Sequence, residues 1–201
     1  MSPSRRLFHF KTIMAGALLL SLAGCGINHI PTYYQQVNAA WSQVQNEYQR
    51  RADLVPNLVA TVKGYAKHEA GVLEAVTEAR AKVTQTRIPA NILSNPAAFK
   101  QFEQNQATLS GALSRLMVVT ENYPNLKADQ NFLTLQSQLE GTENRIAVAR
   151  RDYILAVQKY NTELTTIPGR WYRAMFYSDK TPLQNFTATA PNAEQAPQVK
   201  F

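Results

Sequence analysis

From Tyr33 to Leu164 the apolar residues recur at steps of three and four, and this spacing constrains the fold more than any other feature. Such a period gathers apolar side chains on one face of a helix, whereas a half-buried strand needs strict alternation, which never persists here. The pattern therefore predicts an all-α protein, folded as an elongated antiparallel four-helix bundle over residues 31–178. Its four apolar stripes are Val37, Trp41, Val44 and Tyr48; Val55, Val59, Val62, Ala66, Leu73 and Val76; Phe99, Phe102, Leu109, Leu113 and Leu116; and Phe132, Leu135, Leu139, Ile146, Tyr153, Val157, Tyr160 and Leu164.

The breaks between stripes carry residues that begin or end helices. Asn95 before Pro96 is typical of an N-cap followed by proline at the first helical position, where its missing N–H costs nothing. Residues 88–94 would then be the preceding loop. We expect a second loop at 123–125, because proline disfavours helical geometry in the residue before it. Residues 167–169, Ile-Pro-Gly, should end the last long helix.

Pro56 is the ambiguous boundary. In a helix interior it would remove one hydrogen bond and clash with the carbonyl of Ala52, at a cost of about 3 kcal/mol. One reading places Asp53 as the cap of a new helix, and the other is a continuous first helix over 31–87 that is kinked at Pro56. The apolar stripe keeps its phase across Pro56, which favours the kink. A single 31–87 helix would be about 85 Å long, far longer than the 96–122 helix that could cover it, so we predict a break.

The first 25 residues have the features of an exported lipoprotein. A basic start and the apolar run 13–23 lead to Leu-Ala-Gly-Cys at 22–25, which resembles the bacterial lipobox. The run is too short to cross a bilayer, which takes about 20 apolar residues. We therefore expect a signal peptide at 1–24, a lipidated Cys25, and a tether over 25–30. Two or three acyl chains make such an anchor effectively permanent.

Cys25 is the only cysteine of the chain, so no internal disulfide is expected. Gly26 follows it where inner-membrane retention typically uses Asp. The expected location is the bacterial cell envelope, and in a Gram-negative source the outer membrane, facing the periplasm.

The charge balance does not point to nucleic acid. The whole chain carries a formal net charge of +7, but setting aside Arg5, Arg6 and Lys11 leaves 18 basic and 14 acidic residues, a net of +4. These charges are interspersed and form no long block of one sign. A nucleic-acid partner is not expected. The mild positive balance is typical of solvated helix faces, and the alternative is that it favours an anionic membrane surface or cell-wall polymer.

The C-terminal part changes character after Gly169. Residues 170–177 form an aromatic-rich helical turn, expected to close the end of the bundle or, alternatively, to lie at a membrane interface where Trp and Tyr rings are favoured. Residues 179–201 are rich in Pro, Ala, Gln, Thr and Asn without periodicity. We expect them to be extended or disordered.

A search for catalytic patterns finds little. His68-Glu69 begins like a zinc-protease helix, but position 72 is valine, so the second ligand is missing. Glu140 and Glu143 lie one turn apart and would form an acid/base pair only if buried. No Glu-x-x-His pair supports a di-iron site. The sequence therefore predicts no enzyme, no metal and no cofactor.

A longer set of residues resembles the LemA family. It begins with Arg-Arg-Ala-Asp-Leu-Val-Pro-Asn-Leu-Val at 50–59 and continues through Lys63, Tyr65, His68 and Glu69. Further matches lie at 76–80, at 121–124 with 126–128 and Phe132, at 143–146 with 149–150, and at 160–161, so the resemblance covers about residues 31 to 178. It implies an envelope-associated helical bundle without established catalytic activity. Relatives are often encoded near membrane-associated proteases or other envelope proteins, which implies adaptor or scaffold work. Many relatives look as if they keep an N-terminal transmembrane helix, so the anchor type is not carried over.

The motif at 50–69 is the first place to look for a functional surface. Asn57 could offer its amide to carbonyls left free by Pro56, and Arg50, Arg51 and Asp53 could pair across helices near the same bend. A structural role is one explanation; the alternative is partner binding. The candidate residues are Arg50, Arg51, Asp53, Pro56, Asn57, Lys63, Tyr65, His68 and Glu69.

Three functions remain open at this stage. The favoured one is a membrane-tethered, non-catalytic scaffold or adaptor for an envelope protein, such as a membrane-associated protease. The second is a module that binds cell wall or anionic lipid through Lys, Arg and the 170–177 aromatics. The third is a hydrolase centred on His68. The sequence names neither the partner nor the oligomeric state.

Overall fold

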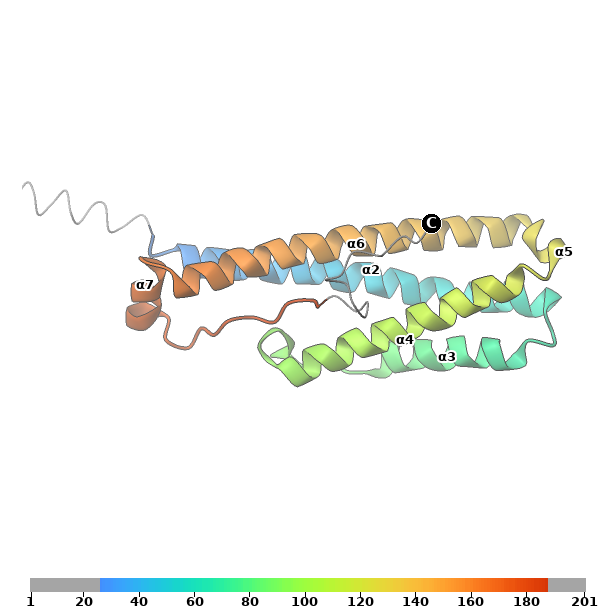
Figure 1. Ribbon diagram of the computed structural model, residues 1–201, viewed down its shortest axis with the longest axis horizontal. Helices are drawn as coiled ribbons and strands as arrows, with labels where there is room; N and C mark the ends of the chain where they lie inside the picture. Colours follow the sequence, from blue (N-terminus) through green and yellow to red (C-terminus); the bar gives the residue numbers. More distant parts are fainter. Residues whose placement is uncertain (1–25, 188–201) are drawn as a thin grey trace, which may run out of the picture. The chain divides into compact units, whose positions relative to one another are not determined.

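The structure is a computed structural model that describes residues 26–187, and within that range it contains helices and no strand. The predicted signal peptide at 1–24 and the predicted lipidation site Cys25 lie outside these residues. The long helices are α2 (His29–Tyr65), α3 (Ala70–Gln85), α4 (Pro96–Thr120) and α6 (Gln130–Thr165), joined by the short α5 (Pro124–Lys127) and followed by α7 (Gly169–Phe176); η1 (Ile92–Ser94) is a single 3₁₀ turn (Figure 1). The prediction of an all-α helical bundle is confirmed.

The chain forms two compact units. In the described range, one contains residues 26–39 and 156–182, and the other contains residues 40–155 and 183–187. Helices α2 and α6 each contribute residues to both. We call these the terminal unit and the main unit and describe each by itself. None of the helices that the structure describes is both long and apolar enough to cross a membrane.

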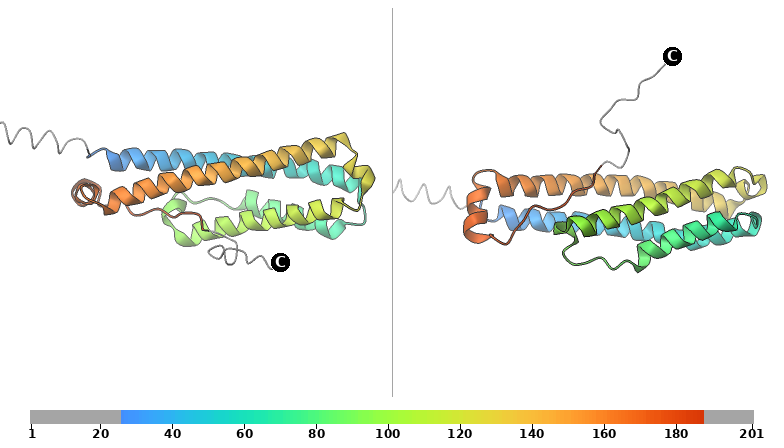
Figure 2. Two further views of the ribbon diagram at one scale, coloured as in Figure 1. Left: turned by 45° about the horizontal axis from the view of Figure 1, so that its top comes forward. Right: turned by 60° about the horizontal axis from the view of Figure 1, so that its bottom comes forward.

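The main unit is a bundle of four helical segments, from α2, α3, α4 and α6. Pairs that join α2 to α6 run in opposite order along the two helices, as in Glu47 with Arg145 and Arg51 with Glu143, so these helices are antiparallel. Arg51 also bonds residues 106 and 110 of α4, and α3 packs along α4, which Figure 2 shows in both of its views. The predicted stripes meet in the core of this bundle, where every stripe residue of α4 is buried.

The prediction of a break at Pro56 is wrong. Helix α2 continues through Pro56 to Tyr65, and the chain turns directly after it, at 66–69. The carbonyl of Ala52, which proline cannot serve, accepts a hydrogen bond from Nε of Arg80 on α3 at 2.9 Å. The alternative of one helix over 31–87 is also wrong at its C-terminal end, because α2 ends at Tyr65 and α3 is a separate helix.

Helix α6, and not the shorter α4, is the helix that matches α2 in length. Helix α6 has 36 residues and α2 has 37, so the two are matched in length. Within the main unit, Tyr153 of α6 lies 5.5 Å from Trp41 of α2, between ring centroids, and within the terminal unit Tyr160 lies 5.7 Å from Tyr34. The stripe of α2 is therefore covered on both sides of residue 39 without a break.

Several predicted boundaries are confirmed. Asn95 caps α4 and accepts a hydrogen bond from the backbone N–H of Ala98 at 3.1 Å, with Pro96 in the first turn. Helix α6 ends at Thr165, just before the predicted stop at 167–169. The predicted loop at 123–125 contains the start of the short helix α5 instead of irregular chain.

The chain after α7 has no helix up to Thr187, which agrees with an extended segment. The end of this segment is nevertheless packed against other helices. In the main unit, Leu183 and Phe186 are buried. The Phe186 ring packs 5.1 Å from Phe99 and 5.4 Å from Tyr153, whose hydroxyl donates to the carbonyl of Gln184 at 2.7 Å. The sequence pattern gave no sign that this segment completes a core.

The terminal unit is held by contacts between the start of α2, the end of α6 and α7. Nδ1 of His29 lies 3.5 Å from a carboxylate oxygen of Glu163, and the ammonium of Lys159 lies 4.2 Å from the Tyr33 ring centre. Gly169 begins α7 where the backbone of Glu163 leaves no room for a Cβ atom. The domain limits predicted from sequence, 25–30, 31–178 and 179–201, remain predictions.

Candidate functional site

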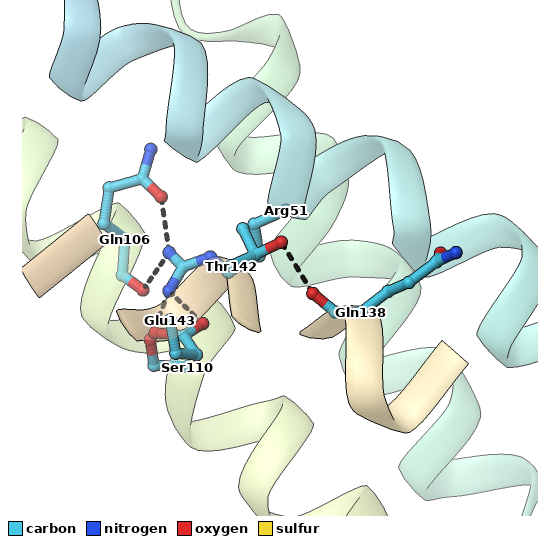
Figure 3. Close-up of polar contacts among 6 residues, drawn as sticks. All are labelled: Arg51, Gln106, Ser110, Gln138, Thr142 and Glu143. Carbon is cyan, nitrogen blue, oxygen red and sulfur yellow. Dashed lines mark hydrogen bonds and ion pairs between the residues drawn. The ribbon is translucent and has the colours of Figure 1, made fainter. Parts of the chain in front are cut away.

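Arg51 is the centre of the predicted motif, and it is buried in the main unit, only 1% exposed. Figure 3 shows its guanidinium between α4 and α6. Nη1 donates to Ser110 Oγ at 2.6 Å and to a carboxylate oxygen of Glu143 at 3.0 Å. Nη2 donates to the carbonyl of Gln106 at 3.2 Å and to its side-chain oxygen at 2.6 Å. The expectation that Arg51 pairs across helices is confirmed, and Arg51 joins three helices of the bundle.

The surroundings of the guanidinium complete this cluster. Its carbon lies 5.0 Å from the Tyr48 ring centre, a distance suited to a cation–π contact. Burial raises the pKa of Tyr48, with the charges of Arg150 and Arg51 opposing the rise. Thr142, directly before Glu143 on α6, donates to the carbonyl of Gln138 at 2.7 Å (Figure 3). Of the three guanidinium nitrogens of Arg51, Nε has no hydrogen-bond partner in the described chain.

A small cavity of about 270 Å³ borders the Arg51 cluster. Its charged lining is balanced, because Arg51 and Arg150 are offset by Glu103 and Glu143. Both η nitrogens of Arg51 are already taken by acceptors within the protein. This arrangement favours a structural joint over a ligand site, because a ligand would have to displace protein acceptors.

The other residues near Pro56 do not join this cluster. Asn57 is exposed and its amide makes no hydrogen bond within residues 26–187, so the prediction that it serves free carbonyls is wrong; Arg80 does so. Asp53 accepts from Gln49 on its own helix at 2.7 Å, and so pairs along α2 instead of across helices. Arg50 is exposed and forms no ion pair with the described residues. The predicted cross-helix pairing therefore holds for Arg51 alone.

Tyr65 and Glu69 flank the turn between α2 and α3, and each bonds to the segment between α4 and α6. The Tyr65 hydroxyl donates to Asp129 at 2.8 Å, and the Tyr123 hydroxyl donates to Glu69 at 3.0 Å. Donation to a carboxylate raises the pKa of both tyrosines. Asp129 also caps α6, accepting the backbone N–H of Phe132 at 3.0 Å; this bond and the one from Tyr65 lower the pKa of its carboxyl. These two residues of the motif therefore fasten one end of the main unit.

The residues considered for catalysis have different surroundings and partners. His68 is exposed in the turn at 66–69 and has no polar partner among the described residues. Glu140 accepts from Gln136 at 3.1 Å, whereas Glu143 pairs with Arg51. No group of three or more His, Cys, Asp or Glu side chains in residues 26–187 is placed to hold a metal ion.

Lys63 leads to a different feature, an open groove of about 850 Å³ between α2 and α3, which we call the α2–α3 groove. Its floor is made of small and aliphatic residues. Its rims carry two lysines from the α2 side and two glutamates from α3. None of these four charged side chains forms an ion pair within the described chain. The lining is Val59, Ala60, Lys63, Gly64, Lys67, Ala70, Leu73, Glu74, Thr77 and Glu78.

Gly64 marks the open part of this groove. A Cβ atom built there would meet no atom within 4 Å, so no packing contact of the chain itself explains a glycine inside α2. A helix-interior glycine costs about 1 kcal/mol relative to alanine. The small side chains at positions 60, 64 and 70 leave room for another chain to approach the backbone closely.

Sequence reasoning missed several partners of the motif. Gln106 and Ser110 are ordinary polar residues in the stripe pattern of α4, and nothing local marks them as acceptors for Arg51. Arg80 likewise gives no local hint that it serves a carbonyl 28 residues earlier. Asp129 could have been found, because an aspartate three residues before the first apolar position of a stripe is typical of an N-cap.

With the geometry established, comparison with known proteins identifies the family. A model described as LemA family matches residues 40–201 of this chain. The chain belongs to the LemA family. The match includes the whole motif at 50–69, and with it the Arg51 cluster and the α2–α3 groove.

The LemA protein described here is also similar to magnetosome proteins called MamQ. It is 34% identical over 76 residues to MamQ 1 and to MamQ 2 of Paramagnetospirillum magneticum, which covers 34% of this chain and 28% of each relative. It is 24% identical over 157 residues to MamQ of Magnetospirillum gryphiswaldense, covering 70% of this chain and 58% of that protein. The matched region thus spans less than two thirds of the length of these relatives.

Proposed function

We propose that this LemA protein is a lipid-anchored, non-catalytic scaffold that binds a helix of a partner protein in the α2–α3 groove. The observation that carries the proposal is the groove itself, about 850 Å³ in volume, with an apolar floor and unpaired charges on both rims. Helix-in-groove binding uses such a surface, with apolar anchors below and charged flanks above.

The charges define the partner's chemistry. Lys63 and Lys67 line the groove from the α2 side, and Glu74 and Glu78 line it from α3. An amphipathic helix with acidic residues on one flank and basic residues on the other would satisfy both rims, and the asymmetry would fix its direction. An envelope protein, such as a membrane-associated protease, is the class of partner that we propose.

The absence of catalysis is part of the same proposal. The buried Arg51 is held by Glu143 and by residues of α4, so its guanidinium is already engaged within the protein. His68 lies exposed in a turn. The LemA family match and the magnetosome names of the MamQ relatives support a structural role in association with a membrane.

The anchor that we propose is the acylated thiol of Cys25, at the end of the Leu-Ala-Gly-Cys sequence. It would hold the protein in the bacterial cell envelope, at the outer membrane in a Gram-negative source. Mass spectrometry of the mature N-terminal peptide tests this step: we expect Cys25 as the first residue, carrying a diacylglyceryl group. An N-terminal peptide that contains unmodified Cys25 would contradict it.

Site-specific photocrosslinking in native membranes tests the groove. A photoreactive residue replaces Ala60 or Thr77, both lining the groove, and in a matched control it replaces exposed Val148 of α6. We expect the same partner to be captured from the two groove positions and not from the control. Equal capture at Val148, or no capture from the groove, would contradict the proposal.

Charge reversal makes the test specific. The double variant K63E/K67E should lose the crosslink because it places four acidic groups around the groove. Exposed surface substitutions usually change folding stability by less than about 0.5 kcal/mol, so the fold should be retained, which circular dichroism checks. The variant R50E reverses an exposed charge on α2 outside the groove lining and should keep the crosslink.

A further inference from the structure

The terminal unit exposes an apolar surface that its own core does not use. Ile167, Trp171, Met175 and Phe176 are all more than half exposed, with Trp171 at 60% and Met175 at 73%. Trp171 and Met175 lie one turn apart on α7, so their side chains share one face of that helix. Exposed apolar side chains scattered singly are ordinary, but a group of four within ten residues indicates a surface that another phase or molecule covers.

The start of the described chain lies against the same helix. A Cβ atom built on Gly26 would lie 2.8 Å from Cε2 of Tyr172, so the backbone at Gly26 lies against this side chain of α7. Cys25 is bonded directly to Gly26 in the sequence. A membrane anchor at Cys25 would therefore enter the bilayer within one residue of a contact with α7.

The charge of α7 suits an anionic lipid surface. Its sequence, Gly-Arg-Trp-Tyr-Arg-Ala-Met-Phe, contains two arginines and no acidic residue. Arg170 is exposed and forms no ion pair within the described chain, whereas Nε of Arg173 donates to the carbonyl of Lys180 at 2.9 Å. Basic residues beside Trp and Phe are typical of helices that lie in the headgroup region of a bilayer.

We propose that α7 lies in the interface of the bilayer that holds the N-terminus, with Trp171, Met175 and Phe176 among the acyl chains and Arg170 at anionic headgroups. The proposal rests on the anchoring at Cys25 but not on the α2–α3 groove. It assigns α7 a second membrane contact, which would limit how the tethered protein rotates about its anchor. Helices of this kind insert their apolar face about 5–10 Å below the headgroups.

The two tryptophans of the chain make the proposal measurable. Trp41 is buried in the main unit and Trp171 is exposed, so the difference between the wild-type protein and W171F reports Trp171 alone. The full lipidated chain, purified from membranes, is reconstituted into vesicles of phosphatidylethanolamine and phosphatidylglycerol. We expect brominated phospholipid to quench the fluorescence of Trp171 and acrylamide in the water phase not to quench it. The emission maximum of Trp171 should lie at short wavelength.

Variants separate docking from anchoring. M175E/F176E should abolish quenching by brominated lipid while the protein still floats with the vesicles. V118E alters a similarly exposed aliphatic residue of α4 and should leave the quenching unchanged. R170E should reduce quenching in vesicles that contain phosphatidylglycerol and not in vesicles of phosphatidylcholine alone.

Three results would overturn the docking of α7. If the protein floats but acrylamide quenches Trp171 and brominated lipid does not, α7 lies in water. The docking of α7 is then wrong, and only the proposal of a lipid anchor is supported. If neither quencher reaches Trp171 on floated protein, another protein or a second copy covers it. A protein that does not float at all contradicts the anchoring as well, and the groove experiment remains a separate test of the scaffold.

Discussion

Replacement of Arg51 is the sharpest test of how the main unit is held together. Arg51 is 1% exposed, and its guanidinium makes four hydrogen bonds, to Ser110, to Glu143 and twice to Gln106. R51A would remove all four hydrogen bonds of the buried guanidinium, leave the buried Gln106 side chain without its donor and create a cavity. Such changes cost about 3–5 kcal/mol, a large share of the stability of a typical domain.

Graded substitutions show which contact matters. R51M keeps most of the volume but leaves the Gln106 side chain buried without a donor, which costs about 1–3 kcal/mol. E143Q keeps a hydrogen-bond acceptor, and the Glu143 side chain is 43% exposed, so the loss should be below about 1 kcal/mol. The double variant R51M/Q106L removes the stranded amide and should recover part of the R51M loss.

Urea unfolding followed by far-ultraviolet circular dichroism measures these differences. With a slope of about 2 kcal/mol per molar urea, a loss of 4 kcal/mol lowers the midpoint by about 2 M. The order of stability should be wild type, then E143Q, then R51M, then R51A. An E143Q variant as unstable as R51A would show that the ion pair, and not the bonds to α4, holds the guanidinium, and a stable R51A would refute the whole account.

Three further predictions use groups elsewhere in the two units. Tyr160→Phe should leave folding stability unchanged or raise it, because the buried hydroxyl has no partner in the described chain and burial raises its pKa to about 12. Tyr153→Phe should lower folding stability by about 1 kcal/mol, because the Tyr153 hydroxyl donates to the carbonyl of Gln184. Thermal unfolding compares the two variants. The folded state lowers the pKa of the Asp129 carboxyl, so its contribution to folding stability is complete above about pH 4 and is lost as the pH falls through the folded pKa. The folding stability of D129N should therefore depend less steeply on pH below 4 in acid titrations. The same pH dependence as wild type would contradict this. Gly169→Ala should destabilise the terminal unit, because the added methyl group overlaps backbone at the end of α6, and a stability equal to wild type would show that α7 can shift to admit it.

Much of the fold was predictable because helical burial is a local property. The side chains of Trp41, Leu109 and Tyr153 are buried, as their spacing predicts. The cap at Asn95 was equally readable, since an N-cap bonds a residue three positions ahead. Such features need only the neighbouring turn of the chain, so the sequence contains all the information that they require.

The site was less predictable because its partners come from distant parts of the chain. Pro56 looked like a helix break until Arg80, 24 residues later, was found to serve the carbonyl of Ala52. Arg51 was expected to pair, but nothing in the sequence selected Gln106 and Ser110 as its acceptors. Those choices depend on the register in which α4 lies along α2.

The sequence by itself determined that this chain forms helices, where most of them begin and end, and which face of each is apolar, because these follow from the 3.6-residue repeat and from capping chemistry. Only the tertiary structure decided that α2 runs through Pro56, that Arg51 is a buried joint, and that an apolar groove stays open between α2 and α3. The physical reason is that buried polar groups need specific partners, and those partners are fixed by how separate helices pack, not by the order of residues within any one of them.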